Sequence, residues 1–244
     1  MARTLRNQNP HSIKDLIKRI PVIGPTAARL AQLPVIARVR RLAFPGSVSY
    51  WETRYREGGT SGPGSYGRLA EFKAVTLNEF VRARNIRNVL ELGCGDGAQL
   101  ELAKYSDYVG IDVAAVSVER CRSRFAADPT KRFYLADNVP DNLGKFDLSL
   151  SLDVIYHLVE DHVFDSYMNS LFARSQHHVV IYASDYDART DSPHVRHRKF
   201  TAWIAQNARD WRPAGYLANP FPWDPIRPED TSFADFHFFA RDAR

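Results

Sequence analysis

Short apolar runs alternate with amphipathic segments along most of this chain. Runs that are apolar nearly throughout and rich in β-branched, leucine and aromatic residues are typical of buried strands. The predicted strands cover residues 88–92, 107–112, 132–136, 146–152, 178–183 and 232–241. Apolar positions at helical spacing predict helices over residues 67–83, 98–104, 115–125, 159–173 and 200–208. Because strands and helices alternate along the chain, the pattern predicts an α/β fold with a doubly wound, mainly parallel sheet.

A glycine-rich turn follows the first predicted strand directly. Gly93, Gly95 and Gly97 occupy alternate positions, and Asp112 ends the next strand, 19 residues after Gly93. Glycines let the backbone pass close to a ligand without Cβ clashes. A carboxylate at the tip of the adjacent strand can accept hydrogen bonds from both hydroxyls of a ribose. The layout therefore predicts a nucleoside site.

The glycine spacing and one acidic residue narrow the choice of nucleoside. The spacing is G-x-G-x-G, whereas dinucleotide-binding proteins use G-x-G-x-x-G to bring a helix N-terminus onto a pyrophosphate. Glu91 lies just ahead of the turn, where a carboxylate would repel phosphate and suit a cation. S-adenosylmethionine has a ribose, no phosphate and a positively charged amino-acid end, so we predict it as the cofactor.

The ends of the other strands add to this predicted cofactor site. Ligands of doubly wound sheets lie at the carboxyl ends of the strands. Asp137 and Asn138 follow the third strand, where they would face the adenine, and Asp153 follows the fourth. Asp137 and Asp153 also suit helix caps. The remaining predicted cofactor contacts come from the turn, from the end of the second strand and from a loop before it: Glu91, Gly93, Cys94, Gly95, Val113, Tyr66 and Arg68.

A second glycine series precedes the helix at 67–83. Gly62, Gly64 and Gly67 match G-x-G-x-x-G literally, but they follow no strand, so we do not interpret them as a dinucleotide site. Aromatic and basic residues flank this loop. We interpret it as a cover over the cofactor or the acceptor, with a plain linker as the alternative.

The groups that follow the fourth and fifth strands predict where the methyl acceptor, the molecule that receives the methyl group, would bind. His157 is the first candidate for a general base, because an imidazole titrates near neutral pH. Asp153 and His194 are further catalytic candidates. The polar loop 185–198 suits acceptor binding. A divalent metal held by some of its residues and Asp153 is an alternative, although no spacing is diagnostic of a metal. Residues 151–157 read SLDVIYH and lack the Asn/Asp-Pro-Pro-Tyr/Phe run of nucleic-acid amino methyltransferases, which disfavours base methylation.

Positive charge is concentrated at the N-terminus. Residues 1–45 hold nine of the 33 basic residues and one of the 28 acidic residues, so the rest of the chain carries a net charge of −3. A domain with a net negative charge is not typical of proteins that bind along nucleic acids. We divide the chain into a basic helical arm, 1–45, and a catalytic domain, 46–244. The arm is interpreted either as a helical lid or as a peripheral contact with an anionic membrane surface.

The remaining composition favours a cytoplasmic location. The chain has 244 residues, 44% of them hydrophobic, and no run long enough to span a bilayer. The first 20 residues lack the apolar core of a secretory signal peptide. Two cysteines, Cys94 and Cys121, form no disulfide framework and are too few to ligate an iron–sulfur cluster.

Several segments of the chain resemble class I S-adenosylmethionine-dependent methyltransferases, in particular a bacterial branch associated with sugar and glycan modification. They are YWETRYREGGTSGPGSYGRLAEFK, VLELGCGDG, SLDVIYHLVED, HVRHRKF and TSFADFHFF. The resemblance spans residues 50–241. It implies a seven-stranded sheet closed by an antiparallel hairpin, and it gives Asp112, Asp137 and the end of the fourth strand the cofactor roles described above.

The same resemblance implies O-methylation of a saccharide during polysaccharide biosynthesis. A saccharide or other small-molecule hydroxyl is therefore the expected acceptor. The alternatives are a thiol or amine methyltransferase acting on a small molecule, and a methylase of a protein or lipid-linked carrier. A cofactor-binding scaffold that uses its arm at a membrane is the non-catalytic alternative.

Overall fold

The computed structural model describes residues 42–242, and from Phe44 onward these form one compact unit. The predicted arm lies almost wholly outside the described residues. Its boundary with the catalytic domain remains a prediction. No helix within 42–242 combines the length and the apolar character needed to cross a membrane.

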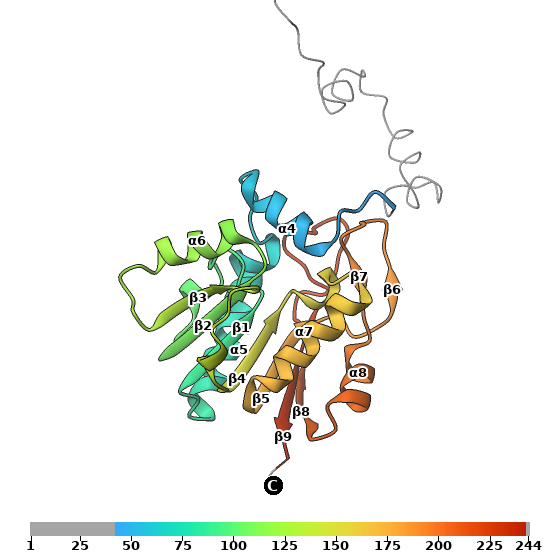
Figure 1. Cartoon of the computed structure of the whole chain (residues 1–244). Helices are drawn as coiled ribbons and strands as arrows, with labels where there is room; N and C mark the ends of the chain where they lie inside the picture. The colour runs from blue at the N-terminus through green and yellow to red at the C-terminus, as the bar shows by residue number, and fades with distance from the viewer. Residues whose placement is uncertain (1–41, 243–244) are drawn as a thin grey trace, which may run out of the picture. The chain divides into compact units, whose positions relative to one another are not determined.

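A seven-stranded sheet forms the centre of the domain (Figure 1), in the order β3-β2-β1-β4-β5-β9-β8. Strands β1 to β5 are parallel, and β9 runs antiparallel to both β5 and β8. The strands are β1 (Asn88–Leu92), β2 (Asp107–Asp112), β3 (Lys131–Leu135), β4 (Phe146–Leu152), β5 (Ser175–Ala183), β8 (Trp211–Leu217) and β9 (Asp235–Arg241). The predicted doubly wound sheet and its closing antiparallel hairpin are confirmed.

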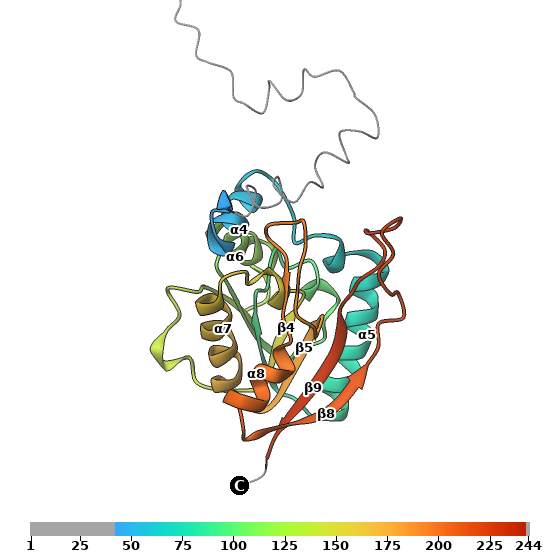
Figure 2. The same cartoon turned by 90° about the vertical axis from the view of Figure 1, so that its right-hand side faces the viewer.

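Helices cover both faces of this sheet. Figure 2 shows α5 on one side and α7 and α8 on the other. The helices are α4 (Ser47–Arg56), α5 (Gly67–Ala83), α6 (Ala115–Arg124), α7 (Asp161–Ala173) and α8 (Phe200–Asn207), with single 3₁₀ turns η1 (Pro63–Ser65), η2 (Leu100–Leu102), η3 (Asp141–Leu143) and η4 (Ile155–His157). Because both faces are covered, the central strands are buried along nearly their whole length.

Three local predictions differ from the structure. The helix predicted over 98–104 is wrong: only η2 forms there. Asn78 of α5 donates to the Leu102 carbonyl and accepts the Lys104 N–H, which ties this segment to α5 and lets the chain turn early into β2. Strand β8 was not predicted, since Pro213 and Gly215 interrupt its pattern and the register shifts between them.

The third difference lies in the polar loop 185–198. It contains a short hairpin of β6 (Ala188–Arg189) and β7 (Arg196–His197). Two-residue strands carry too little alternation to be recognised in a sequence. The hairpin brings His197 back towards the end of β5, where its Nδ1 lies 2.7 Å from Ser184 Oγ.

Candidate active site

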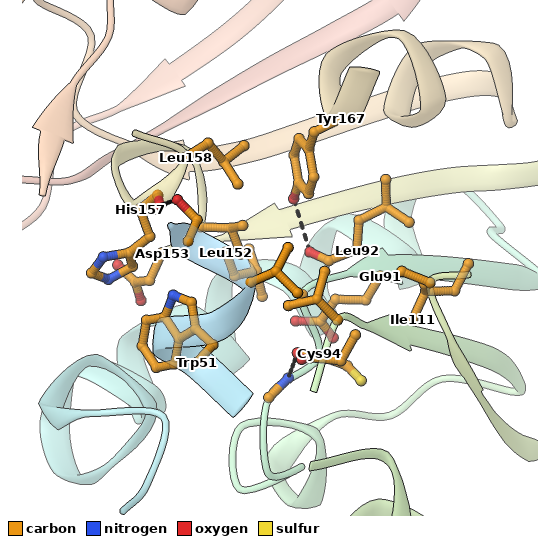
Figure 3. Close-up of a pocket in the computed structure, with 18 of the residues that line it drawn as sticks. Trp51, Glu91, Leu92, Cys94, Ile111, Leu152, Asp153, His157, Leu158 and Tyr167 are labelled. Atoms are coloured by element: carbon orange, nitrogen blue, oxygen red, sulfur yellow. Dashed lines mark hydrogen bonds between the residues drawn. The ribbon is translucent and has the colours of Figure 1, made fainter. Parts of the chain in front are cut away.

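A cavity of about 410 Å³ opens at the carboxyl ends of β1, β2 and β4. Its volume lies within the usual range for small-molecule sites. Figure 3 shows Trp51, Asp153 and His157 on one side of the cavity, and Glu91, Cys94 and Ile111 on the other. Most of the wall comes from α4, the β1 end with its glycine turn, the β2 end, the β4 end and one face of α7, and further residues come from the loop 57–66, from α5 and from the segment after β3.

The glycine turn has the conformation that its sequence predicts. Gly93, Gly95 and Gly97 have φ angles of 79°, 57° and 77°, a region that residues with a Cβ rarely adopt. A Cβ on Gly93 would collide with the Val154 side chain, and one on Gly95 with Ser61 Oγ. The turn therefore needs glycine for its backbone angles and for the close packing above it.

Asp112 is held against this turn by backbone groups. Its Oδ2 accepts the Gly95 N–H at 2.9 Å, and its Oδ1 accepts the Ala114 N–H at 2.9 Å. The side chain is buried, and burial raises the pKa of its carboxyl, although these N–H groups oppose the shift. Each oxygen keeps further acceptor capacity on the cavity side. A fixed carboxylate of this kind fits the two hydroxyls of a ribose.

A cover built from α4 and the loop 57–66 closes over the turn. Ser61 and Asp96 exchange two hydrogen bonds: Ser61 N–H donates to Asp96 Oδ2, and Asp96 N–H donates to Ser61 Oγ, each at 2.9 Å. The Tyr55 hydroxyl lies 2.9 Å from Ser61 Oγ. Arg120 of α6 donates to the carbonyls of Tyr55 and Gly59 and secures the cover from below. The loop that carries Gly62 and Gly64 thus packs over the glycine turn, and its role as a cover over the cofactor or the acceptor stays a prediction.

A buried ion pair crosses the floor of the cavity. Lys73 of α5 is 1% exposed, and its Nζ lies 2.5 Å from Asp153 Oδ2. The Tyr156 hydroxyl donates to Asp153 Oδ1 at 2.8 Å. Asp153 has a φ of 60°, a strained angle for a residue with a side chain. Both of its oxygens are therefore engaged, which leaves it a poor candidate for a free base.

Glu91 is the second acid of the floor. It is 4% exposed, and its Oε2 accepts a hydrogen bond of 2.7 Å from the Tyr108 hydroxyl. Burial raises the pKa of its carboxyl to about 7, whereas the Tyr108 hydrogen bond and the Lys73 charge lower it.

His157 lies in the cavity wall at η4. Its Nδ1 is 3.0 Å from the carbonyl oxygen of His194. Since a carbonyl only accepts, Nδ1 carries the proton in this contact and Nε2 is left as the basic nitrogen. Burial lowers the pKa of His157 to about 4, so the ring is neutral at physiological pH. His194 itself stacks on Tyr50, with ring centroids 4.5 Å apart, and supports His157 from outside the wall.

The structure separates the predicted site residues into two groups. One group lines the cavity: Glu91, Gly93, Cys94, Gly95, Asp112, Val113, Asp153 and His157. The other does not: Tyr66, Arg68, Asp137, Asn138 and His194. Asp137 and Asn138 are exposed, and their neighbours Ala136 and Val139 line the cavity in their place. Tyr66 donates to Asp96, while Arg68 stacks over Phe221 and donates to the Asp230 carbonyl.

Most polar groups of the loop 185–198 are used inside the fold. Asp185 accepts from Thr201, Asp187 from the Lys199 N–H, and Arg196 and Arg198 both pair with Asp161. Across residues 42–242, no group of three or more His, Cys, Asp or Glu side chains is arranged to hold a metal ion.

Sequence reasoning missed several residues of the wall, among them Trp51, Tyr55, Lys73 and Gln99. Trp51 packs edge-on against His157, with centroids 4.9 Å apart. One signal was available for Lys73, which shares the helical stripe of Leu69, Ala70 and Leu77. A lysine at an apolar position of a buried face indicates a paired or functional charge.

The comparisons with known proteins agree with this geometry. Residues 89–175 match the family model described as a methyltransferase domain. Mouse EEF1A lysine methyltransferase 4 is 32% identical over 94 residues, which are 37% of this chain. The 94 matched residues make up 36% of the mouse protein, so the match spans about a third of that protein's length.

Solved structures share the fold at low identity. N-methyltransferase NodS from Bradyrhizobium japonicum, in complex with S-adenosyl-L-homocysteine, is 17% identical with a TM-score of 0.55, covering 72% of this chain and 87% of its own. The magnesium protoporphyrin IX methyltransferase from Synechocystis, with the same ligand bound, is 12% identical with a TM-score of 0.54, covering 72% and 85%. CalS10, an amino pentose methyltransferase from Micromonospora echinaspora, is 16% identical with a TM-score of 0.53, covering 79% and 97%.

The family-model match, the sheet order and the glycine turn agree with one another. Residues 89–175 match a methyltransferase domain, the described residues share the fold of S-adenosylmethionine-dependent methyltransferases, and S-adenosylmethionine is the cofactor that these findings support.

Proposed function

We propose that this protein transfers the methyl group of S-adenosylmethionine to a hydroxyl group of a saccharide. The observation that carries the proposal is the position of His157, which lines the same cavity as Asp112 and the glycine turn. When bound, the cofactor supplies an electrophilic methyl group on a positively charged sulfur. A neutral imidazole in the same cavity can take the proton that the attacking hydroxyl gives up.

The other residues act by binding and orientation. Asp112 would hold the ribose, and the backbone of Gly93 and Gly95 would pass beneath the amino-acid end of the cofactor. Asp153 would orient η4, and so His157, through Tyr156 rather than move a proton itself. The cover formed by α4 and the loop 57–66 would exclude water. Positioning of this kind is a large part of the rate enhancement in bimolecular reactions.

A saccharide is favoured by the Trp51 ring, which lines the cavity beside His157, and by the sequence resemblance to glycan-modifying enzymes. The Trp51 and His157 ring centroids are 4.9 Å apart. Aromatic faces pack well on the C–H faces of sugar rings, while the imidazole addresses a hydroxyl. The structural relative CalS10 is described as an amino pentose methyltransferase.

An amine is the second candidate acceptor, and the Trp51 ring favours it too. Aromatic faces attract cations, and one similar protein is a lysine methyltransferase. An ammonium group must also lose a proton before it accepts a methyl group, so His157 would serve as base in either case. A screen of labelled methyl transfer over sugars, glycolipids, amines and small phenols distinguishes the two.

His157→Gln is expected to lower turnover by about 10²–10⁴-fold, the usual contribution of a general base. The binding of S-adenosylhomocysteine should be unchanged. Because burial lowers the pKa of His157 to about 4, the base stays neutral down to about pH 5, so the acid limb of wild-type turnover should lie near pH 4 rather than near 6.5. Labelled methyl transfer measured against pH checks both points.

His177→Gln is the matched control, since His177 is exposed at the far end of β5. It should leave turnover and its pH profile unaltered. Full turnover in His157→Gln would remove His157 as the base.

We propose further that the basic arm, 1–45, brings the enzyme to an anionic membrane surface. Nine basic residues against one acidic residue support electrostatic attraction to such lipids. Deletion of residues 1–41 should abolish co-sedimentation with phosphatidylserine vesicles and leave S-adenosylhomocysteine binding intact. Lost cofactor binding in that deletion would instead identify the arm as a lid.

A further inference from the structure

Four aromatic rings form a continuous cluster outside the cavity: Tyr186, His197, Trp223 and Phe233. The ring centroids of Tyr186 and His197 are 4.5 Å apart, and those of His197 and Phe233 are 4.6 Å apart. Trp223 packs on Phe233, with ring centroids 5.6 Å apart. None of the four residues lines the cavity described above. We call these four residues the aromatic patch.

The aromatic patch lies at the same end of the sheet as the cavity. Tyr186 follows the carboxyl end of β5, and Phe233 comes just before β9, whose first residue pairs with the last residue of β5. The Phe233 ring packs edge-on against Tyr156, with centroids 4.8 Å apart. The Tyr156 ring in turn lies 4.6 Å from that of His157, which lines the cavity. One ring therefore separates the aromatic patch from the cavity wall.

Two rings of the aromatic patch are open to solvent. Tyr186 is 46% exposed and Trp223 is 48% exposed. Because one face of Tyr186 stacks on His197, its exposed area lies on the opposite face and along the edge. The Tyr186 hydroxyl makes only a long contact of 3.4 Å with His197 Nε2, and the Trp223 indole N–H has no acceptor among residues 42–242. Exposed apolar surface that is concentrated in one place marks an interaction site.

Hydrogen bonds fix the aromatic patch in place. His197 Nδ1 lies 2.7 Å from Oγ of the buried Ser184. Trp223 and Phe233 each follow one residue of an isolated β-bridge, which holds their two stretches of chain together. A surface that is already ordered loses little conformational entropy when a ligand binds to it.

The aromatic patch carries no net charge. Burial lowers the pKa of His197, which keeps its ring neutral at pH 7. The acids on either side of Tyr186 accept hydrogen bonds from the N-terminal end of α8. The acid next to Trp223 pairs with Arg227 at 3.3 Å. A neutral ligand therefore suits this surface better than a charged one.

We propose that the aromatic patch binds a neutral glycan chain, one end of which enters the cavity. The proposal rests on the proposed function, because it takes a saccharide as the acceptor, and it adds that the acceptor is longer than one sugar. A sugar ring has an apolar C–H face and hydroxyl groups around its edge. The aromatic patch offers the complement, which is exposed ring faces with a hydroxyl and an N–H at their edges.

Isothermal titration calorimetry of the full chain, with S-adenosylhomocysteine present, tests the proposal. The neutral probes are maltohexaose, cellohexaose, mannohexaose and xylohexaose, which are compared with glucose and with the anionic chain hexagalacturonate. At least one neutral hexasaccharide should bind at least about tenfold more tightly than glucose, since a single sugar covers only one ring. Hexagalacturonate should bind no more tightly than glucose.

Trp223→Ala and Tyr186→Ala should each weaken hexasaccharide binding by about 3–10-fold, the order of one aromatic contact. Trp223→Phe should recover most of the loss, because it keeps a ring at that position. Tyr216→Ala is the matched control: Tyr216 is 60% exposed on β8, outside the aromatic patch, and its loss should leave binding unchanged. The affinity of each variant for S-adenosylhomocysteine reports that its fold is intact.

Three results would overturn the proposal and leave the proposed function standing. They are no binding by any neutral hexasaccharide, equal binding by the wild type and both alanine variants, and tighter binding of hexagalacturonate than of every neutral chain. Self-association of the wild type in analytical ultracentrifugation that Trp223→Ala abolishes would assign the aromatic patch to a second copy of the chain and overturn the proposal as well. Methyl transfer to no sugar, with hexasaccharide binding intact, would overturn the proposed function instead.

Discussion

Lys73→Met is expected to lower the free energy of unfolding by about 3–5 kcal/mol, because it removes one partner of a buried ion pair and leaves the other uncompensated. Lys73 is 1% exposed and lies 2.5 Å from Asp153, whose side chain is 15% exposed. Methionine has a similar length and fills most of the same space. The loss therefore reflects the missing charge rather than a cavity. Urea unfolding followed by circular dichroism measures it.

The double variant Lys73→Met/Asp153→Asn should recover part of this stability, since it no longer buries an unpaired carboxylate. Lys104→Met, at an exposed lysine, is the matched control and should change stability by less than about 0.5 kcal/mol. A single variant as stable as the wild type, or a double variant no better than the single one, would show that the pair does not act through its charges.

Asp112→Ala is expected to weaken S-adenosylhomocysteine binding about 100-fold or more. Hydrogen bonds to a charged acceptor contribute about 1.5–3 kcal/mol each, and two ribose hydroxyls would lose theirs. The substitution also frees the N–H groups of Gly95 and Ala114, which Asp112 holds in place at the turn. Isothermal titration calorimetry measures the change in affinity.

The matched control for this prediction lies in the same strand. Asp107 begins β2, is half-exposed and pairs with Arg132 at 2.8 Å. Asp107→Ala should bind the ligand as tightly as the wild type. Unchanged affinity in Asp112→Ala would remove the ribose assignment.

The central strands could be predicted from the sequence because burial on both faces leaves a plain signal. The predicted ranges 88–92, 107–112 and 146–152 coincide with β1, β2 and β4. Strand β8 could not be found this way. It lies at the edge of the sheet, only Trp211 of its residues is buried, and Pro213 and Gly215 break its pattern. Its pairing with β9, rather than its own residues, makes it a strand.

The part of the site that the sequence revealed is the part that is continuous along the chain. Glu91, the glycine turn and Asp112 follow from strand ends and spacing, and Glu91, Gly93, Gly95 and Asp112 line the cavity. The α4 wall and Lys73 depend on tertiary packing that no local spacing encodes. The same limit explains Asp137 and Asn138: the chain turns after β3 so that Ala136 and Val139, rather than the polar pair, face inward.

The central claim is that the cavity above the Gly93–Gly97 turn binds S-adenosylmethionine through its ribose and its cationic end. A crystal structure of the protein with S-adenosylhomocysteine tests it most directly. The account predicts both ribose hydroxyls within hydrogen-bonding distance of the Asp112 carboxylate, and the amino-acid chain over Gly93 and Gly95. Ligand density elsewhere, or a ribose that does not contact Asp112, would contradict it.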